Sequence, residues 1–287
     1  MTDSIGVFGL GLIGQALAHR LLQAGHSVAG FDPNPDRMAD LEQAGGLPAQ
    51  EADIWASKTV LAAVFDTDQL LSVIRSAPAG SDVTLVATST CDPDRMLELE
   101  EEAARYGIRL LEAPLSGTSK DLANGNAVFL VGGSESLADA NTWLFSLLGR
   151  AHYYVGGLGN GNRAKLAINL VLGLNRAALA EGLVFAKALG LQPNDFLELA
   201  RNSAAYSAVM ETKGPLMTAR DFKPLGRITQ SAKDFKLIRT LAGNAEQGLP
   251  FAETYSAMVD DCIAEGEGDI DNSAILLAIE RVKFQGD

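Results

Sequence analysis

The sequence has few of the residues that build metal sites and disulfide frameworks. Cysteine occurs only twice in 287 residues, as Cys91 and Cys262, and histidine occurs three times. The two cysteines stand far apart and in no metal-ligand spacing, so we expect free thiols and neither a disulfide framework nor a zinc site. The sequence therefore predicts chemistry that needs no bound metal.

Positive charge is also scarce. Lys and Arg together number 23 against 36 Asp and Glu, which gives a formal net charge of −13 at pH 7. No basic stripe is present that could release counterions from phosphates, so nucleic acid is not an expected partner.

No apolar run approaches the length of a membrane span, and the first residues lack the basic region and cleavage site of a signal peptide. We expect a soluble, cytoplasmic protein without a membrane partner.

The first half of the chain alternates between strand and helix patterns. Hydrophobic residues make up 47% of the chain, enough for a core in each of two domains. Apolar runs predict strands at residues 5–8, 27–31, 59–64, 83–87, 108–112, 128–131 and 153–155. Helical patterns between them cover residues 16–24, 36–44, 69–76, 95–106 and 137–147. Repeated strand–helix units predict an α/β fold with a mostly parallel, doubly wound sheet.

The second half shows only helical patterns. Residues 156–191 contain no proline and predict one long helix whose apolar residues cover most of its circumference, as in a helix buried on nearly all sides. Further helices are predicted at residues 195–202, 205–212, 228–245, 252–264 and 273–282. The predicted domains are therefore 1–158, a dinucleotide-binding Rossmann domain, and 159–287, an all-helical domain joined to it by the long helix.

Two polar residues interrupt the apolar surface of that long helix. Lys165 and Asn169 are four residues apart and so lie on one helix face. Lys165 could simply extend its ammonium group to water. Alternatively, apolar surroundings would disfavour its charged form and lower its pKa toward the range of a general acid/base. The helix alone leaves both interpretations open.

A glycine motif opens the chain. The apolar run 5–8 meets Gly9, Gly11 and Gly14 in a GxGxxG spacing, a helix follows, and Asp32 ends the next strand 23 residues after Gly9. The strand, the helix and the terminal acid together make a dinucleotide fingerprint: a tight turn, a backbone open to a pyrophosphate, and a helix N-terminus that supplies N–H groups.

Further motifs line up with this one in order and spacing. They are Glu112-Ala113-Pro114-Leu115-Ser116-Gly117-Thr118, Gly159-x-Gly161-x-x-x-Lys165 with Asn169, Asp221-Phe222-Lys223-Pro224 with Lys233, Ser89-Thr90 with Pro93, and Val64-Phe65-Asp66. With these motifs the chain resembles the β-hydroxyacid dehydrogenase family, which contains 3-hydroxyisobutyrate dehydrogenase and tartronate semialdehyde reductase. The likeness covers almost the whole length. Glu112, Thr118 and Gly226 depart from the family pattern, which bears on the identity of the substrate.

The resemblance implies an NAD(P)-dependent oxidoreductase. It transfers a hydride between the nicotinamide and a small β-hydroxy acid, or the matching semialdehyde, with Lys165 as general acid/base and Asn169 fixing the lysine. Ser116, Gly117 and Thr118 would bind the substrate carboxylate. The implied cofactor-binding residues are Gly9, Leu10, Gly11, Leu12, Ile13, Gly14, Asp32, Val64, Phe65, Thr90 and Lys233.

Two alternative functions would not require Lys165. A non-catalytic dinucleotide-binding module and an imine reductase of the same superfamily both generally lack the lysine, so its presence disfavours them.

The cofactor and the assembly can also be predicted. Asp32 without an arginine directly after it favours NAD over NADP, although Arg37 lies one helical turn further on. The resemblance implies a homodimer or homotetramer. The helical half is the expected interface, because it has more apolar residues than one small domain needs to bury, among them Leu276, Leu277, Ile279 and Val282 in the last helix.

Overall fold

The computed structural model describes residues 4–283, so the outermost ends of the two predicted domains lie outside the described residues. The chain divides into two compact units, Met1–Lys165 and Leu166–Asp287. Each unit has its own hydrophobic core.

The first unit contains a six-stranded sheet in which every strand pair is parallel. Its strands are β1 (Ile5–Phe8), β2 (Val28–Phe31), β3 (Leu47–Pro48), β4 (Thr59–Ala62), β5 (Val83–Ala87) and β6 (Ile108–Glu112). They run in the order β3-β2-β1-β4-β5-β6. This confirms the predicted doubly wound sheet, and the strand order reverses between β1 and β4, where such sheets bind ligands.

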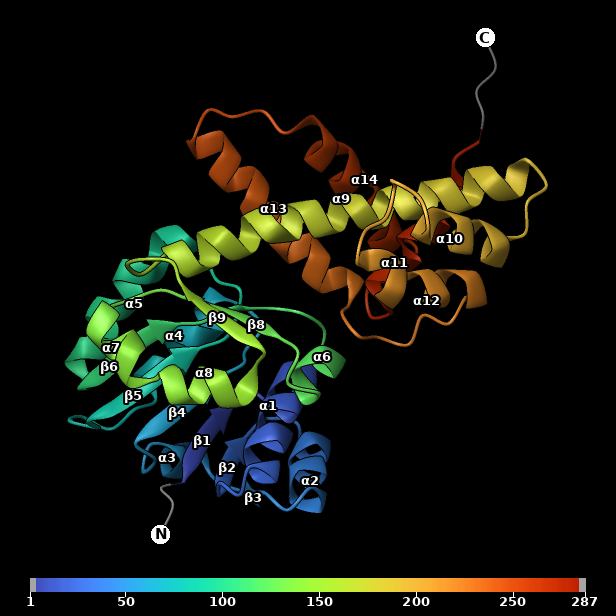
Figure 1. The fold of residues 1–287 in the computed structure, drawn as a ribbon. Helices are drawn as coiled ribbons and strands as arrows, with labels where there is room; N and C mark the ends of the chain where they lie inside the picture. The colour runs from blue at the N-terminus through green and yellow to red at the C-terminus, as the bar shows by residue number, and fades with distance from the viewer. Residues whose placement is uncertain (1–3, 284–287) are drawn as a thin grey trace. The chain divides into compact units, whose positions relative to one another are not determined.

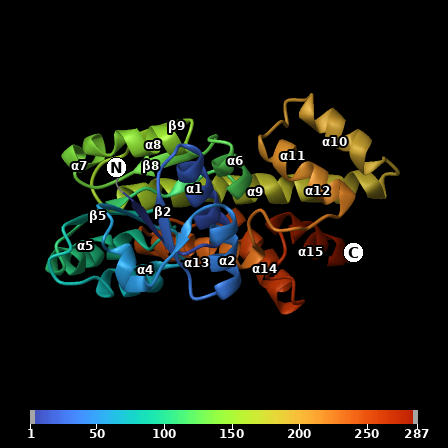
Figure 2. The same cartoon turned by 90° about the horizontal axis from the view of Figure 1, so that it is seen from below.

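Helices cover both faces of this sheet, and each face has its own core. One core takes residues from α1 (Leu12–Gln23) and α2 (Pro35–Gln43), and the other takes residues from α3 (Glu51–Ile54), α4 (Thr67–Arg75) and α5 (Met96–Arg105). Figure 2 shows α4 and α5 on one side of the strands and α8 with β8 and β9 on the other. The apolar stripe of α4, which includes Leu70 and Ile74, is fully buried and anchors that helix on the sheet.

A smaller sheet follows, with β7 (Leu115–Ser116) antiparallel to β8 (Val128–Val131) and β9 (Ala151–Tyr154) parallel to β8. The helices around it are α6 (Ser119–Ala123), α7 (Glu135–Ala140) and α8 (Thr142–Leu148). The prediction of one helix at 137–147 was wrong. Asn141 separates α7 from α8, and its side-chain amide donates back to the Leu137 carbonyl. Side-chain competition of this kind for backbone partners is typical of asparagine.

The second unit is helical, as predicted (Figure 1). Its helices are α9 (Asn160–Ala188, which begins in the first unit), α10 (Pro193–Arg201), α11 (Val209–Thr212), α12 (Gly214–Ala219), α13 (Ile228–Asn244), α14 (Pro250–Ala264) and α15 (Ile275–Arg281). Short 3-10 turns span Pro93–Arg95 in the first unit and Asn272–Ala274 here. The helix predicted at 205–212 begins only at Val209, because Ser203 accepts the N–H groups of Ala205 and Tyr206 and forms a turn there.

The core of the helical unit depends on a close approach of α9 and α13. A β-carbon on Gly173 would lie 2.6 Å from the Phe235 ring, so only glycine fits there. Phe235 packs against Tyr255 with 4.2 Å between ring centroids, and the Tyr255 hydroxyl accepts a bond from Arg176 at 2.7 Å.

A buried ion pair fixes the loop between α12 and α13. The Lys213 ammonium lies 2.8 Å from both carboxylate oxygens of Asp271, which is 0% exposed. Asp271 also accepts the backbone N–H groups of Leu225 and Gly226. Burial by itself raises the pKa of Asp271, but the charge and hydrogen bond of Lys213 and the hydrogen bonds from Ser273 outweigh it, so that the pKa lies below its ordinary value.

Two expectations about apolar surface need correction. The long helix is not buried on nearly all sides: Val171 is 57% and Phe185 63% exposed. Conversely, Leu276 and Ile279 of α15 are buried in the core of their own unit, so α15 is not the apolar surface that was expected. A sequence pattern identifies apolar positions but cannot tell which of them the unit itself covers.

The helix α9 is also more apolar than expected, since no apolar run was expected to approach the length of a membrane span. By length and composition α9 could cross a membrane, with a mean hydropathy of 1.4 over 18 residues. The core helix of a soluble protein satisfies the same criterion, so this is weak evidence for a membrane segment.

Candidate functional site

The glycine motif forms a backbone cradle at the carboxyl end of β1. Gly9 has a φ of 80°, and a β-carbon on Gly14 would lie 1.8 Å from the Gly9 carbonyl oxygen, so neither position accepts a side chain. A β-carbon on Gly11 would instead meet only the Arg37 guanidinium, at 4.0 Å. The first turn of α1 begins here, and the N–H groups of a first helical turn lack partners within the helix. The cradle therefore fits a dinucleotide pyrophosphate.

Asp32 lies beside this cradle at the end of β2. One carboxylate oxygen accepts the Leu10 N–H at 2.8 Å and the other accepts the Asn34 N–H at 2.9 Å. The Arg37 guanidinium is 3.1 Å from the same carboxylate and 40% exposed. Asp32 is therefore charge-compensated, and Arg37 is the accessible partner of the pair.

The other residues predicted for the cofactor follow neighbouring strands. Val64 and Phe65 come after β4, and Thr90 comes after β5. Because the carboxyl ends of parallel neighbouring strands meet at one edge, the structure brings these residues and the cradle to the same edge of the sheet. Phe65 is 43% exposed, whereas Thr90 is 7% exposed.

The predicted substrate motif lies at the turn from β7 into α6. Thr118 caps α6: its hydroxyl accepts the Asp121 N–H at 3.1 Å, while Asp121 accepts the Thr118 N–H at 2.7 Å. The Thr118 N–H, which we expected to bind a carboxylate, is thus engaged within the protein. Asp121 was missed, although Thr-x-x-Asp is a recognisable capping pattern.

Lys165 and Asn169 lie on the first turns of α9, as their spacing predicts. Lys165 is only 8% exposed, so it does not simply extend to water. The Asn169 side-chain amide donates to Asp234 at 2.7 Å, and the Lys233 ammonium lies 3.3 Å from the other oxygen of Asp234. Within the helical unit, Asp234 therefore joins the predicted residues Asn169 and Lys233.

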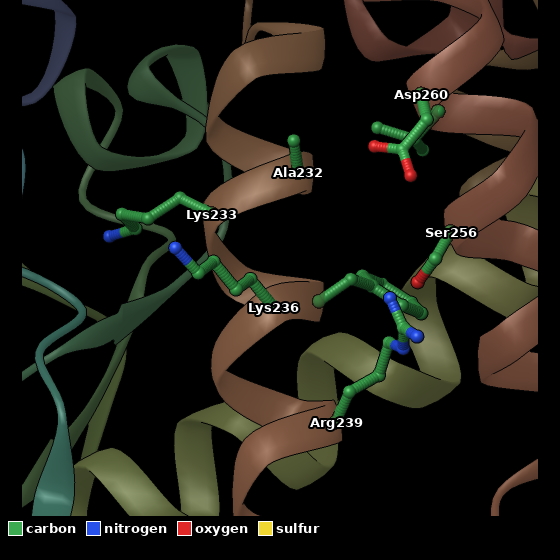
Figure 3. A pocket seen from close by; sticks show the side chains of 8 residues that line it. Ala232, Lys233, Lys236, Arg239, Ser256 and Asp260 are labelled. Atoms are coloured by element: carbon green, nitrogen blue, oxygen red, sulfur yellow. The ribbon is translucent and has the colours of Figure 1, made fainter.

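A pocket of about 380 Å³ lies between α13 and α14. Ser256 and Asp260 of α14 face Arg239 of α13, while Lys233 and Lys236 extend to the other side of α13 (Figure 3). Its cations are largely compensated, because Lys233 pairs with Asp234 and Arg239 pairs with Glu253 at 2.8 Å. Of the residues predicted for function, Lys233 lines it.

Glu112 is the site-related residue whose role the sequence did not reveal. It was noted only as a departure from a motif and was expected to bear on the substrate. Instead its carboxylate is fully buried and accepts N–H groups of Gly161 and Asn162 at the start of α9. The available signal was an acidic residue that ends a strand directly after the apolar pair Leu110 and Leu111.

The parallel sheet, the glycine cradle at its switch point and the acid that ends β2 define a dinucleotide-binding domain of the Rossmann type.

Comparison with known proteins identifies the group. Residues 4–156 match the family model described as the NAD binding domain of 6-phosphogluconate dehydrogenase, and residues 159–279 match the NAD-binding model of NADP-dependent 3-hydroxyisobutyrate dehydrogenase. The chain belongs to the β-hydroxyacid dehydrogenase family of the 3-hydroxyisobutyrate dehydrogenase type. It is an NAD(P)-dependent enzyme that acts on CH–OH groups.

Individual relatives match over nearly the full length. The chain is 27% identical to glyoxylate/succinic semialdehyde reductase 1 of Arabidopsis thaliana, over 98% of both chains. It is 29% identical to 2-hydroxy-3-oxopropionate reductase of Escherichia coli, over 96% of this chain and 97% of that one. The crystal structure of 3-hydroxyisobutyrate dehydrogenase from Salmonella typhimurium superposes with a TM-score of 0.87 at 24% identity, covering 96% of this chain and 99% of that one, which establishes the fold.

Proposed function

We propose that this enzyme interconverts a small β-hydroxy acid and the matching semialdehyde or keto acid, with Lys165 as the general acid/base. The observation that carries this assignment is the burial of Lys165, 8% exposed on the second turn of α9. A lysine shielded from water can exchange a proton with a bound substrate without competition from solvent.

The bound nicotinamide would accept or supply the hydride. In the oxidation direction, Lys165 takes the proton of the substrate hydroxyl; in reduction, its ammonium group polarises the carbonyl oxygen and donates the proton. Asn169 donates to Asp234, so its carbonyl oxygen is the atom left to accept a bond from the lysine one turn earlier.

We infer that the substrate carboxylate binds at Ser116 and the Gly117 N–H. The Thr118 N–H would take part only if the capping bond to Asp121 opened. The names of the two curated relatives support short acids that carry an aldehyde group, such as glyoxylate, succinic semialdehyde and 2-hydroxy-3-oxopropionate, as the compounds to test first.

We further infer NAD as the preferred cofactor, since Asp32 would accept bonds from a ribose diol and repel a 2′-phosphate. The match to a family model of NADP-dependent enzymes and the exposed Arg37 keep NADP as the alternative.

A homodimer or homotetramer is the proposed assembly. It is supported by large apolar side chains of the helical unit that are more than 40% exposed, among them Val171, Phe185, Leu189, Leu191, Leu199 and Phe251. Large exposed apolar side chains in such number are common at protein interfaces.

A substrate panel tests the proposed reaction. The enzyme would be assayed with NAD and NADP against 3-hydroxyisobutyrate, 3-hydroxypropionate, serine, glycerate, threonate and 4-hydroxybutyrate, and in reverse against glyoxylate, succinic semialdehyde and 2-hydroxy-3-oxopropionate. Turnover of at least one short acid supports the proposal. Dinucleotide binding without turnover of any panel member would instead support a binding module.

A further inference from the structure

A buried carboxylate at the end of β6 takes part in none of the steps above. Glu112 accepts the Gly161 N–H at 2.8 Å, the Asn162 N–H at 3.1 Å and the Asn162 side-chain amide at 2.5 Å. These partners are all donors, whereas a protonated carboxyl would need an acceptor for its own proton, so the arrangement satisfies the carboxylate form. Burial raises the pKa of Glu112, and the hydrogen bonds act against that rise.

The donors belong to the first turn of α9. N–H groups there have no partner within the helix, and Gly159, the residue before the helix, has no side chain to cap them. A negative charge at this end also interacts favourably with the helix dipole. Glu112 therefore caps α9 from a strand 49 residues earlier in the chain.

Asn162 extends this contact to a third segment. With its amide nitrogen on Glu112, its carbonyl oxygen accepts the Cys91 N–H at 2.7 Å. Cys91 directly follows Thr90, and Lys165 lies three residues after Asn162, within one helical turn. One carboxylate thus links the two segments that carry Thr90 and Lys165, all within the first unit.

We propose that Glu112 is a positioning residue, which through Asn162 fixes the spacing between the Ser89–Cys91 segment and the turn of α9 that carries Lys165. This inference rests on the proposed function, because Lys165 moves the proton and Thr90 lies on the cofactor side. Because Glu112 is fully buried, we assign it no contact with the substrate or the nicotinamide. Displacement of reacting groups by about 1 Å can lower a rate by about 100-fold, so the link should act on turnover more than on binding.

The variant Glu112→Gln tests the link. Its amide keeps one oxygen that can accept an N–H bond but places an N–H₂ group where the other carboxylate oxygen was, so the cap is weakened while the side-chain volume is kept. We expect kcat to fall on the order of 10- to 100-fold, while KM and the dinucleotide Kd change by less than about threefold. Glu102→Gln is the matched control: it removes a carboxylate that is 12% exposed and pairs with Arg75 and Arg105 in the same unit, and kcat should not change.

Asn162→Ala provides a second variant that keeps the carboxylate and its backbone donors. It removes both side-chain bonds of Asn162, to Glu112 and to Cys91, but leaves the Gly161 and Asn162 N–H groups on the carboxylate. We therefore expect kcat to fall without loss of the helix cap. In the double variant the two effects on kcat should be less than additive, because both changes interrupt one chain of contacts.

Hydrogen exchange tests the contacts from Glu112 through Asn162 to Cys91 independently of catalysis. In Glu112→Gln, peptides covering residues 89–92 and 160–165 should both exchange faster than in the wild type; in Asn162→Ala, only residues 89–92 should. If the wild type turns over no panel member but this pattern is found, the proposed function fails and the link stands. If the wild type is active and folded Glu112→Gln keeps kcat within about threefold, or if residues 89–92 exchange unchanged in both variants, the positioning role is wrong.

Discussion

At the scale of single residues, Lys165 has the most direct part in the proposed chemistry. Lys165→Ala should lower kcat by about 10²- to 10⁴-fold, the usual contribution of a general acid/base. The dinucleotide Kd should be nearly unchanged, because the pyrophosphate cradle lies at Gly9–Gly14. Steady-state kinetics and cofactor titration by fluorescence measure the two effects.

Lys165→Arg is the control for charge alone. A guanidinium stays protonated and cannot act as a base, so it should restore little activity. Wild-type kcat in Lys165→Ala would show that the lysine is structural.

Arg37 is the residue on which cofactor choice can be tested. Its guanidinium lies 3.1 Å from Asp32 and 40% of the side chain is exposed, so it could also contact a 2′-phosphate. Arg37→Ala should lower kcat/KM for NADP by about 10-fold, the effect of losing one charged hydrogen bond of about 1.5 kcal/mol. In the same variant, kcat/KM for NAD should change little. A wild-type preference for NADP would overturn the predicted choice of NAD.

The Lys213–Asp271 pair predicts how stability depends on pH. Because the pKa of Asp271 is lower in the folded state than in the unfolded chain, its contribution is complete above about pH 4 and is lost as the pH falls below that value. Asp271→Asn leaves a buried lysine without its carboxylate and should cost about 3–5 kcal/mol at pH 7. The cost should shrink toward pH 3.

Urea unfolding at both pH values measures this difference. The control is Asp269→Asn, whose side chain is 87% exposed and pairs with Arg227 at the surface; it should cost less than about 1 kcal/mol. An equal loss of free energy of unfolding in Asp271→Asn and Asp269→Asn would contradict the stabilising role of the Lys213–Asp271 pair.

At the scale of elements, two glycines of α9 allow a matched comparison. Alanine favours a helix interior over glycine by about 1 kcal/mol. At Gly173, however, the new β-carbon would meet the buried Phe235 ring at 2.6 Å, so Gly173→Ala should destabilise the protein by about 1–2 kcal/mol. At Gly182 the nearest atom, on the half-buried Phe196, lies at 3.3 Å and can move aside.

Gly182→Ala should therefore be neutral or stabilising. Free energies of unfolding from urea titrations test both variants. A stabilised Gly173→Ala would mean that Phe235 can shift, and that the contact between α9 and α13 is less tight than described.

The sequence predicts elements well where a long apolar run or a specific local signal marks them. The bounds of β5, β6 and β8 match their apolar runs, and the fingerprint located the cradle. Two-residue strands such as β3 and β7 are missed because they contain too few residues for a pattern.

Residues of the candidate site are likewise predictable where a sequence motif marks them. Cofactor, substrate and proton-transfer residues are found through motifs, and their roles stay predictions. The link from Glu112 through Asn162 to Cys91 is not predictable, because its members are separated by tens of residues and only the fold brings them together.

At the scale of the whole molecule, the apolar surface of the helical unit predicts self-association. Light scattering at micromolar concentration should give a dimer or tetramer. Phe185→Glu would place a charge in that surface and should raise the dissociation constant about 10-fold or more. The control Leu97→Glu changes a residue of the first unit that is similarly exposed, at 62%, and should have no effect. A monomeric wild type would contradict the proposed assembly.

The capping of α9 by Glu112 also restricts how the sequence can evolve. A β-carbon on Gly132 would lie 2.3 Å from a Glu112 carboxylate oxygen, and all three of its nearest atoms belong to the Glu112 side chain. The longer acid therefore tolerates only glycine at position 132, whereas an aspartate, shorter by one methylene, would leave more room. Gly161 is different, because a β-carbon there would lie 2.7 Å from the Leu130 carbonyl oxygen whichever acid stands at position 112. Positions 112 and 132 should consequently covary among descendants of this gene, and the order in which they mutate should matter: the acid must shorten before position 132 can gain a side chain.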